Sequence, residues 1–94
     1  MINCFDGKWA FLSNFYWNEI EHEGIVYPTN EHFFQAMKTL DNDERRQIAN
    51  CSTPGQAKRM GRRVALRPDW EVVKESVYNK IFRSIGIEII GIGV

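Results

Sequence analysis

The sequence predicts a mainly α-helical fold, or an α+β fold, with a short antiparallel β hairpin near the N-terminus. Three observations predict this class. Two short runs with strand-forming residues flank a glycine near position 24, four later segments begin with helix-capping residues, and their apolar residues recur at helical spacing. The chain has 94 residues, so we expect a single domain over residues 1–94.

The strands are expected in the N-terminal third. Residues 2–5 can form a short strand. Residues 19–21 and 25–27 flank His22-Glu23-Gly24, which we interpret as a hairpin with the glycine in its turn.

The first helix is expected to run from Thr29 or Asn30, either of which is a good N-cap, through about Leu40. The proline at position 28 ends the preceding strand. Helical spacing places an apolar stripe on one side of this helix, formed by Phe33, Ala36, Met37 and Leu40. A polar stripe on the other side is formed by Glu31, Gln35 and Lys38.

Three further helices follow. Asn42 can cap a second helix over residues 43–50, and Thr53-Pro54 opens a third that reaches about Met60, with Gly61 as its stop. Asp69 can cap a fourth helix over residues 70–84. Its inward-facing residues are expected to be Val73, Val77, Tyr78 and Ile81. Residues 85–94 fit no capping pattern and could form a strand, a frayed end or an adhesive segment.

Composition excludes several classes of protein. Twelve basic residues balance twelve acidic ones, so a broad cationic surface for nucleic acid is not indicated, although a local patch stays open. Two cysteines without a secretion signal favour reduced thiols and a cytoplasmic location. No apolar run approaches the ~18 residues of a membrane span. No metal-ligand spacing is present, so we expect neither a metal nor a cofactor.

Glu31 is the strongest candidate for a chemical role. It falls in the first turn of the predicted helix, where the positive end of the helix dipole favours an ionised carboxylate. Such a group suits a base or an electrostatic role better than a general acid. Taken alone, the periodicity favours the simpler interpretation, a solvated face with a contact between Glu31 and Gln35.

Four other residues are weaker candidates for substrate binding, and each has a structural alternative. His32 could contact phosphate or shuttle a proton, or it could pack at the helix start. Asn14 could bind ribose hydroxyls or cap a turn. Trp70 could stack on a heteroaromatic ring or belong to the core. Arg62 belongs to a basic group that could hold phosphate or lie in solvent, together with Arg59, Arg63 and Arg67.

These segments together resemble a known family. The chain contains FLSNF at 11–15, a hairpin glycine, and YPTNEHFFQAMK at 27–38. It then has Pro54, Ala57, Gly61-Arg62 and Asp69-Trp70-Glu71 at matching places. This series resembles the NADAR family, which includes the YbiA-like N-glycosidases, and the resemblance covers residues 5 to about 83. It implies a YbiA-like fold.

The resemblance also implies an activity, namely hydrolysis of the C–N bond between ribose and a base or amine. The ribose would belong to ADP-ribose or to a ribosylamine phosphate of riboflavin synthesis, and the ADP-ribose could be carried by a nucleobase or a nucleic acid. Glu31 matches the acidic residue of the helix motif that is thought to be catalytic. Trp70 matches a family tryptophan near the substrate, while Asn14 and Lys38 occupy motif positions expected near the ligand.

The family pattern is incomplete in this sequence. Family members are longer, and their second half carries an acidic residue, a W-G-x-G segment and an N-x-L-G segment that do not occur in residues 1–94. We therefore expect a domain that lacks the family's C-terminal part. The alternative function is a non-catalytic module that binds ADP-ribose or a nucleotide, or an inactive fragment. A small structural domain is the third alternative.

A domain that lacks half of its family's length should expose apolar surface and associate. We therefore expect a homo-oligomer or a complex with a complementing chain. Analytical ultracentrifugation in the micromolar range checks this expectation. A single monomeric species there would contradict it.

Overall fold

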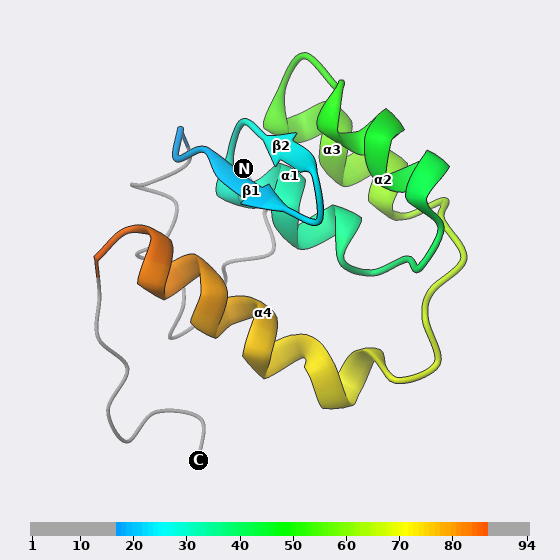
Figure 1. Ribbon diagram of the computed structural model, residues 1–94. Coiled ribbons are helices and arrows are strands. Elements are labelled where there is room, and N and C mark those ends of the chain that lie inside the picture. Colours follow the sequence, from blue (N-terminus) through cyan, green and yellow to red (C-terminus); the bar gives the residue numbers. More distant parts are fainter. Residues whose placement is uncertain (1–16, 87–94) are drawn as a thin grey trace.

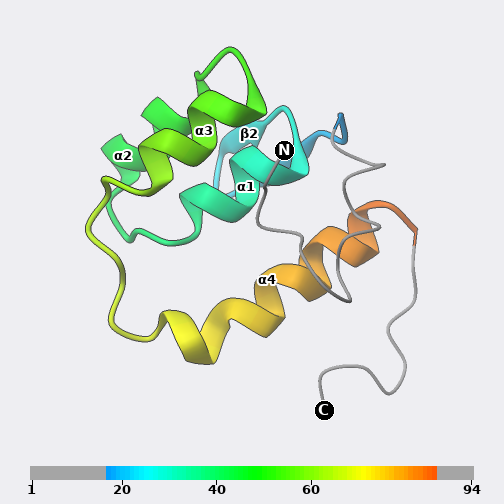
Figure 2. The same ribbon diagram turned by 180° about the vertical axis from the view of Figure 1, so that it is seen from behind.

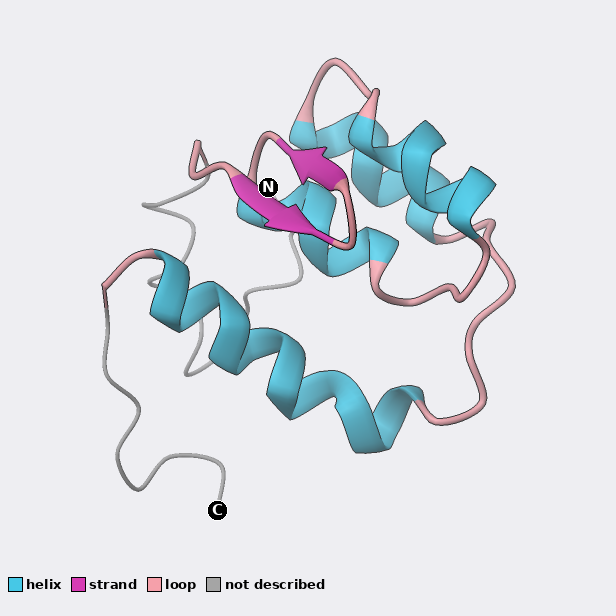
Figure 3. Ribbon diagram, viewed as in Figure 1, coloured by secondary structure: helices cyan, strands magenta, loops and turns pink. Residues whose placement is uncertain are grey.

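The computed structural model describes residues 17–86 and shows two strands followed by four helices (Figures 1 and 3). The elements are β1 (Ile20–His22), β2 (Ile25–Tyr27), α1 (Asn30–Ala36), α2 (Asn42–Ala49), α3 (Pro54–Gly61) and α4 (Trp70–Ser84). The mainly α fold with an N-terminal hairpin is thereby confirmed. The strand predicted at residues 2–5, Asn14, and residues 87–94 lie outside the described residues.

The hairpin forms where a two-residue turn is sterically easiest. Glu23 and Gly24 both have positive φ, 52° and 81°, which is the backbone of a tight type I′ turn. The pairing aligns Ile20 with Tyr27 and His22 with Ile25, so Ile20, Ile25 and Tyr27 all turn toward the core. His22 is therefore a strand residue, and the turn is one residue shorter than the sequence indicates.

Helix α1 is buried along its whole length. The Thr29 hydroxyl caps it by accepting a hydrogen bond from the His32 backbone N–H at 3.0 Å, as the sequence predicts. Every residue of the helix is buried, including the polar Asn30, Glu31 and Gln35. The predicted solvated stripe is therefore wrong for Glu31 and Gln35, because neighbouring elements cover both sides of the helix.

Helix α1 ends at Ala36, four residues before the predicted end at Leu40. The turn tightens here, because the Lys38 and Thr39 N–H groups donate to carbonyls three positions back, and arginines from elsewhere bind the carbonyls that follow the helix. The Arg67 backbone N–H donates to the Lys38 carbonyl at 2.7 Å, and Arg45 Nε donates to the Thr39 carbonyl at 2.9 Å. Leu40 consequently leaves the predicted apolar stripe and is 60% exposed.

The next two helices begin with side-chain caps. In α2 the cap is Asp41, whose Oδ1 accepts from the backbone N–H groups of Asp43 and Glu44 at 2.8 and 3.2 Å, so the predicted cap, Asn42, is the first helical residue instead. In α3 the predicted Thr53 cap is confirmed.

Helix α4 spans the predicted residues, but its start is built differently. The Asp69 side chain makes no capping hydrogen bond. Instead it accepts two hydrogen bonds from Arg67, with Nε–Oδ1 at 2.7 Å and Nη2–Oδ2 at 3.2 Å. Val77, Tyr78 and Ile81 are buried as predicted, and Phe82 is buried as well. Val73, also predicted to face inward, is only partly buried.

Helix α1 lies at the centre of the arrangement, between the α2–α3 pair and α4 (Figures 1 and 2). The hairpin packs beside α1, with His22 and Tyr27 against Phe33. Asn18 joins the parts by donating through Nδ2 to Asn30 Oδ1 at 2.9 Å and to Ser84 Oγ at 2.7 Å, which ties the far end of α4 to the start of α1. Between residues 17 and 86, no helix is both long and apolar enough to cross a bilayer.

Candidate active site

The Glu31 carboxylate lies in the first turn of α1 and is held by an amide. Glu31 is 1% exposed, and Gln35 Nε2 donates to its Oε2 at 2.6 Å. The two residues are four positions apart, so successive turns of the helix place them on the same side. The contact that the sequence offered as the simpler interpretation is present, but it is a buried contact. The hydrogen bond from Gln35 therefore holds Oε2 of the Glu31 carboxylate in one orientation.

Gly61 makes room for the Gln35 side chain. A methyl group added at Gly61 would lie 2.9 Å from Gln35 Cβ and would overlap the amide oxygen. Gly61 is the last residue of α3 and is buried, so its role is close packing and not the helix stop that the sequence predicts. Within the described part of the chain, the buried Gln35 Oε1 accepts no hydrogen bond.

An aromatic cluster lies on the same side of α1. Phe34 meets the edge of Trp70 with ring centroids 5.3 Å apart and an interplanar angle of 78°, and its centroid is 5.2 Å from that of Tyr78. Lys38 Nζ lies 5.7 Å from the centre of the Phe34 ring. Glu31, Phe34, Gln35 and Lys38 follow the i, i+3, i+4, i+7 spacing of one helix face. Trp70 joins this face through Phe34 and is itself a core residue.

His32 is fully buried, and both of its ring nitrogens have partners in the chain. Thr29 Oγ1 lies 2.6 Å from Nδ1, and the Cys51 carbonyl lies 3.0 Å from Nε2. Because a carbonyl can only accept, Nε2 carries the proton and Nδ1 accepts from the Thr29 hydroxyl. This geometry joins α1 to the segment that precedes α3, and it favours the structural interpretation of His32.

The predicted phosphate-binding arginines are not one group. Arg62 follows α3 directly and is exposed, as are Arg59 and Arg63. Arg67 instead lies beside Asp69 and the end of α1.

Asn14 lies outside the described residues. Among the residues described, no three His, Cys, Asp or Glu side chains converge as a metal ion would require.

Sequence reasoning indicated the contact between Glu31 and Gln35 but did not count Gln35 among the site residues, and it missed Gly61 as the support of Gln35. The spacing of four between Glu31 and Gln35 was the available signal for Gln35. No local signal reveals Gly61, because Gly61 and Gln35 belong to different helices and are 26 positions apart in the chain.

Replacing Gly61 with alanine should disturb this site from a distance. The added methyl group overlaps Gln35, so we expect the free energy of unfolding to fall by about 1–3 kcal/mol. Urea denaturation measures the change. The matched control is Gly55→Ala in the same helix, where the nearest atom is 3.9 Å away and alanine should be neutral or stabilising. Equal effects of the two substitutions would contradict the packing role of Gly61.

Burial lowers the pKa of His32 below its ordinary value of 6.5, against the opposing effects of the Cys51 carbonyl and Glu31. The unfolded chain therefore binds more protons than the folded chain just below pH 6.5. The neutral His32 contributes its full share to the free energy of unfolding above that pH, and this share decreases as the pH falls. Urea denaturation from about pH 7.5 to about pH 5.5 should show the decrease. The decrease should be shallower in His32→Gln.

His22→Gln is the control for this prediction, because burial also lowers the pKa of His22. His22 is only partly buried, so its removal should flatten the pH dependence less than removal of His32. A His32→Gln variant with the slope of the unaltered chain would refute the assignment.

Comparison with known proteins finds relatives of this chain. The N-glycosidase YbiA of Escherichia coli (strain K12) is 46% identical over 75 residues, which are 78% of this chain and 47% of that protein. The N-glycosidase YbiA of Shigella flexneri has the same identity and coverage. A riboflavin biosynthesis protein of Vibrio vulnificus (strain YJ016) is 31% identical over 80 residues, 83% of this chain and 22% of that protein.

The solved NMR structure of E. coli YbiA resembles this fold with a TM-score of 0.64 at 40% identity. The similarity covers 88% of this chain and 51% of that one. The chain thus spans about half the length of its YbiA relatives. The NADAR domain family matches residues 4–84, nearly the whole sequence. The chain therefore belongs to the NADAR domain family.

Proposed function

We propose that this chain supplies the acidic residue of an N-glycosidase site, which hydrolyses the C–N bond between a ribose and a base or amine. The observation that carries the proposal is the buried Glu31 carboxylate, whose Oε2 is held at 2.6 Å by Gln35. The names of the YbiA relatives support the class of reaction. The substrate would be ADP-ribose attached to a nucleobase, free or in a nucleic acid, or a ribosylamine phosphate.

The chemistry of the bond explains why a fixed carboxylate is useful. Cleavage places positive charge on the sugar as the C–N bond breaks and its electron pair leaves on nitrogen. Water then forms the new bond to the anomeric carbon and loses a proton, and the leaving nitrogen takes up a proton in turn. Glu31 can stabilise the cationic sugar and accept that proton. Because Glu31 is buried, its interaction with a developing cation is stronger than it would be in water.

The other residues of the face have supporting roles in this proposal. Lys38 is half-buried beside Phe34 and is suited to bind a phosphate group. Trp70 is 6% exposed and packs edge-on against Phe34, so it shapes the aromatic wall instead of offering a free face for stacking. Arg62, which is exposed, remains a proposed phosphate contact from the sequence. Asn14 remains a proposed ribose contact from the sequence motif.

A second candidate function is binding of the same ligand without turnover. A second copy or a complementing chain would then complete the site. Exposed apolar side chains support such an association, with Leu66 58% and Val72 81% exposed. The cytoplasmic location is part of this proposal and rests on the cysteine usage of the sequence.

Glu31→Gln tests the proposed role directly. The substitution keeps the size of the side chain and removes its charge, so we expect base release to fall by about 10²–10⁴-fold while ligand binding is largely retained. Chromatography would follow base release from an ADP-ribosylated nucleoside and from a ribosylaminopyrimidine phosphate. Calorimetry would measure binding.

The matched control is Glu71→Gln, because Glu71 is also an acidic residue in a first helical turn, that of α4, and is exposed. This variant should keep full activity. Undiminished turnover in Glu31→Gln would remove Glu31 from the mechanism. Binding without release by the unaltered chain would favour the second candidate function.

A further inference from the structure

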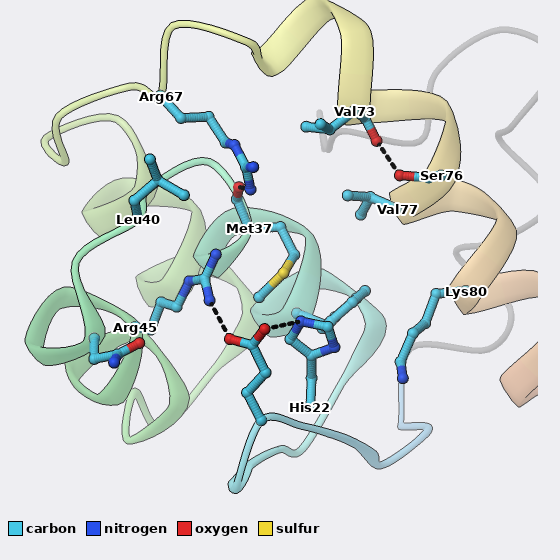
Figure 4. A pocket seen from close by; sticks show the side chains of 12 residues that line it. His22, Met37, Leu40, Arg45, Arg67, Val73, Ser76, Val77 and Lys80 are labelled. Atoms are coloured by element: carbon cyan, nitrogen blue, oxygen red, sulfur yellow. Dashed lines mark hydrogen bonds and ion pairs between the residues drawn. The ribbon is translucent and has the colours of Figure 1, made fainter.

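A groove with a volume of about 440 Å³ opens between the hairpin turn, the end of α1, the start of α2, and α4 (Figure 4). Its apolar lining comes from α1, the turn that follows it, and α4, and consists of Phe33, Met37, Leu40, Val73 and Val77. Its cationic lining consists of Arg45, Arg67 and Lys80. Binding sites for small molecules commonly have ~300–1,000 Å³ and this combination of apolar walls with a few polar groups.

The groove is separate from the Glu31 face. At about 100° per residue, Phe33 and Met37 lie about 160° and 120° around the helix axis from Glu31. Neither Glu31 nor Gln35 lines the groove. Helix α1 therefore presents two different surfaces to its neighbours, and the groove is not explained by the proposed hydrolysis.

The guanidinium of Arg45 is held rigidly in one wall. The Arg45 side chain is 7% exposed, with Nε bound to the Thr39 carbonyl at 2.9 Å and Nη1 bound to Glu23 Oε1 at 3.0 Å. Its Nη2 makes no hydrogen bond to the described residues and stays available. Arg67 is likewise held by Asp69. Side chains held in this way lose little conformational entropy when a ligand binds.

The balance of charge in the groove favours an anion. Glu23 is the single carboxylate among the described lining residues, and Arg45 already pairs with it. Lys80, on the opposite wall, has no ion-pair partner within residues 17–86 (Figure 4). His22 lies at the hairpin end, where burial is the main cause that lowers its pKa; Glu23 opposes this effect, while the charges of Lys80 and Arg45 add to it.

We infer that this groove binds a small amphipathic anion, consisting of an aromatic or branched aliphatic body with one carboxylate or phosphate group. The body lies against Phe33, Met37 and Val77, and the anionic group is held by Lys80, with the fixed charge of Arg45 adding to the positive potential of the groove. The apolar contacts supply affinity by removing surface from water. The charged contacts select against neutral and cationic molecules of the same shape.

The test uses four probes of similar shape and different charge, each titrated into the ¹⁵N,¹³C-labelled chain and followed by NMR. Phenyl phosphate and benzoate are the anions, benzyl alcohol is the neutral control, and benzylamine is the cationic control. The anions should produce saturable shifts at Phe33, Met37, Val77 and Lys80. Comparison of the two anions distinguishes a phosphate site from a carboxylate site.

Lys80→Ala should weaken binding of the anions about tenfold, as expected for loss of one charge-assisted hydrogen bond. Lys80→Glu should abolish it, and an otherwise unchanged spectrum shows that each variant folds. The control is Lys74→Ala, in the same helix and outside the groove lining. Benzyl alcohol should bind several-fold more weakly than either anion, and benzylamine should not bind.

The inference would be overturned if binding of neither anion saturates or if benzylamine binds as well as benzoate. It would also be overturned if the chemical-shift changes occur only around Glu31 and Gly61. The result of this binding test does not depend on whether the chain hydrolyses a C–N bond. Glu31→Gln should leave binding in the groove unchanged, whereas Lys80→Ala should leave base release unchanged.

Discussion

The rest of the structure depends on the burial of a short polar helix from every side. All seven residues of α1 are buried, and four of them are polar. Such groups cost about 1–3 kcal/mol each when they lack a hydrogen-bond partner. At Asn30 and His32 the chain meets this requirement with contacts that are distant in sequence, from Asn18 to Asn30 and from the Cys51 carbonyl to His32. These contacts bring the hairpin and the loop before α3 to the same helix.

The burial also explains how the candidate site is built. Gln35 can reach Glu31 because both lie on one helix face, and it stays there because α3 approaches so closely that only glycine fits at position 61. The contact between α1 and α3 therefore orients a carboxylate that neither helix would orient alone. A close helix–helix approach thereby becomes a constraint on chemistry as well as on stability.

The end of α1 has a similar double role. Arg45 and Arg67 bind the backbone carbonyls that follow the helix, and the same arginines line the groove on its other side. Each is paired with a carboxylate, Glu23 or Asp69, so the charges are fixed in position. The arginines that bind the chain just after the helix thus also set the charge of the groove.

The amino-acid sequence by itself determined the features that depend on neighbours within a few positions. These include the Thr29 and Thr53 caps, the glycine in the hairpin turn, and the family motif around Glu31. Hydrogen bonds of this kind close within one turn of chain, so residue type and spacing predict them.

The tertiary structure alone decided where α1 ends, why Leu40 is exposed, and why Gly61 must be small. It also decided that Glu31 and Gln35 are buried, although their spacing is equally typical of a solvated stripe. The physical reason is that burial depends on which distant element packs over a face, and the periodicity of a single helix contains no information about its neighbours.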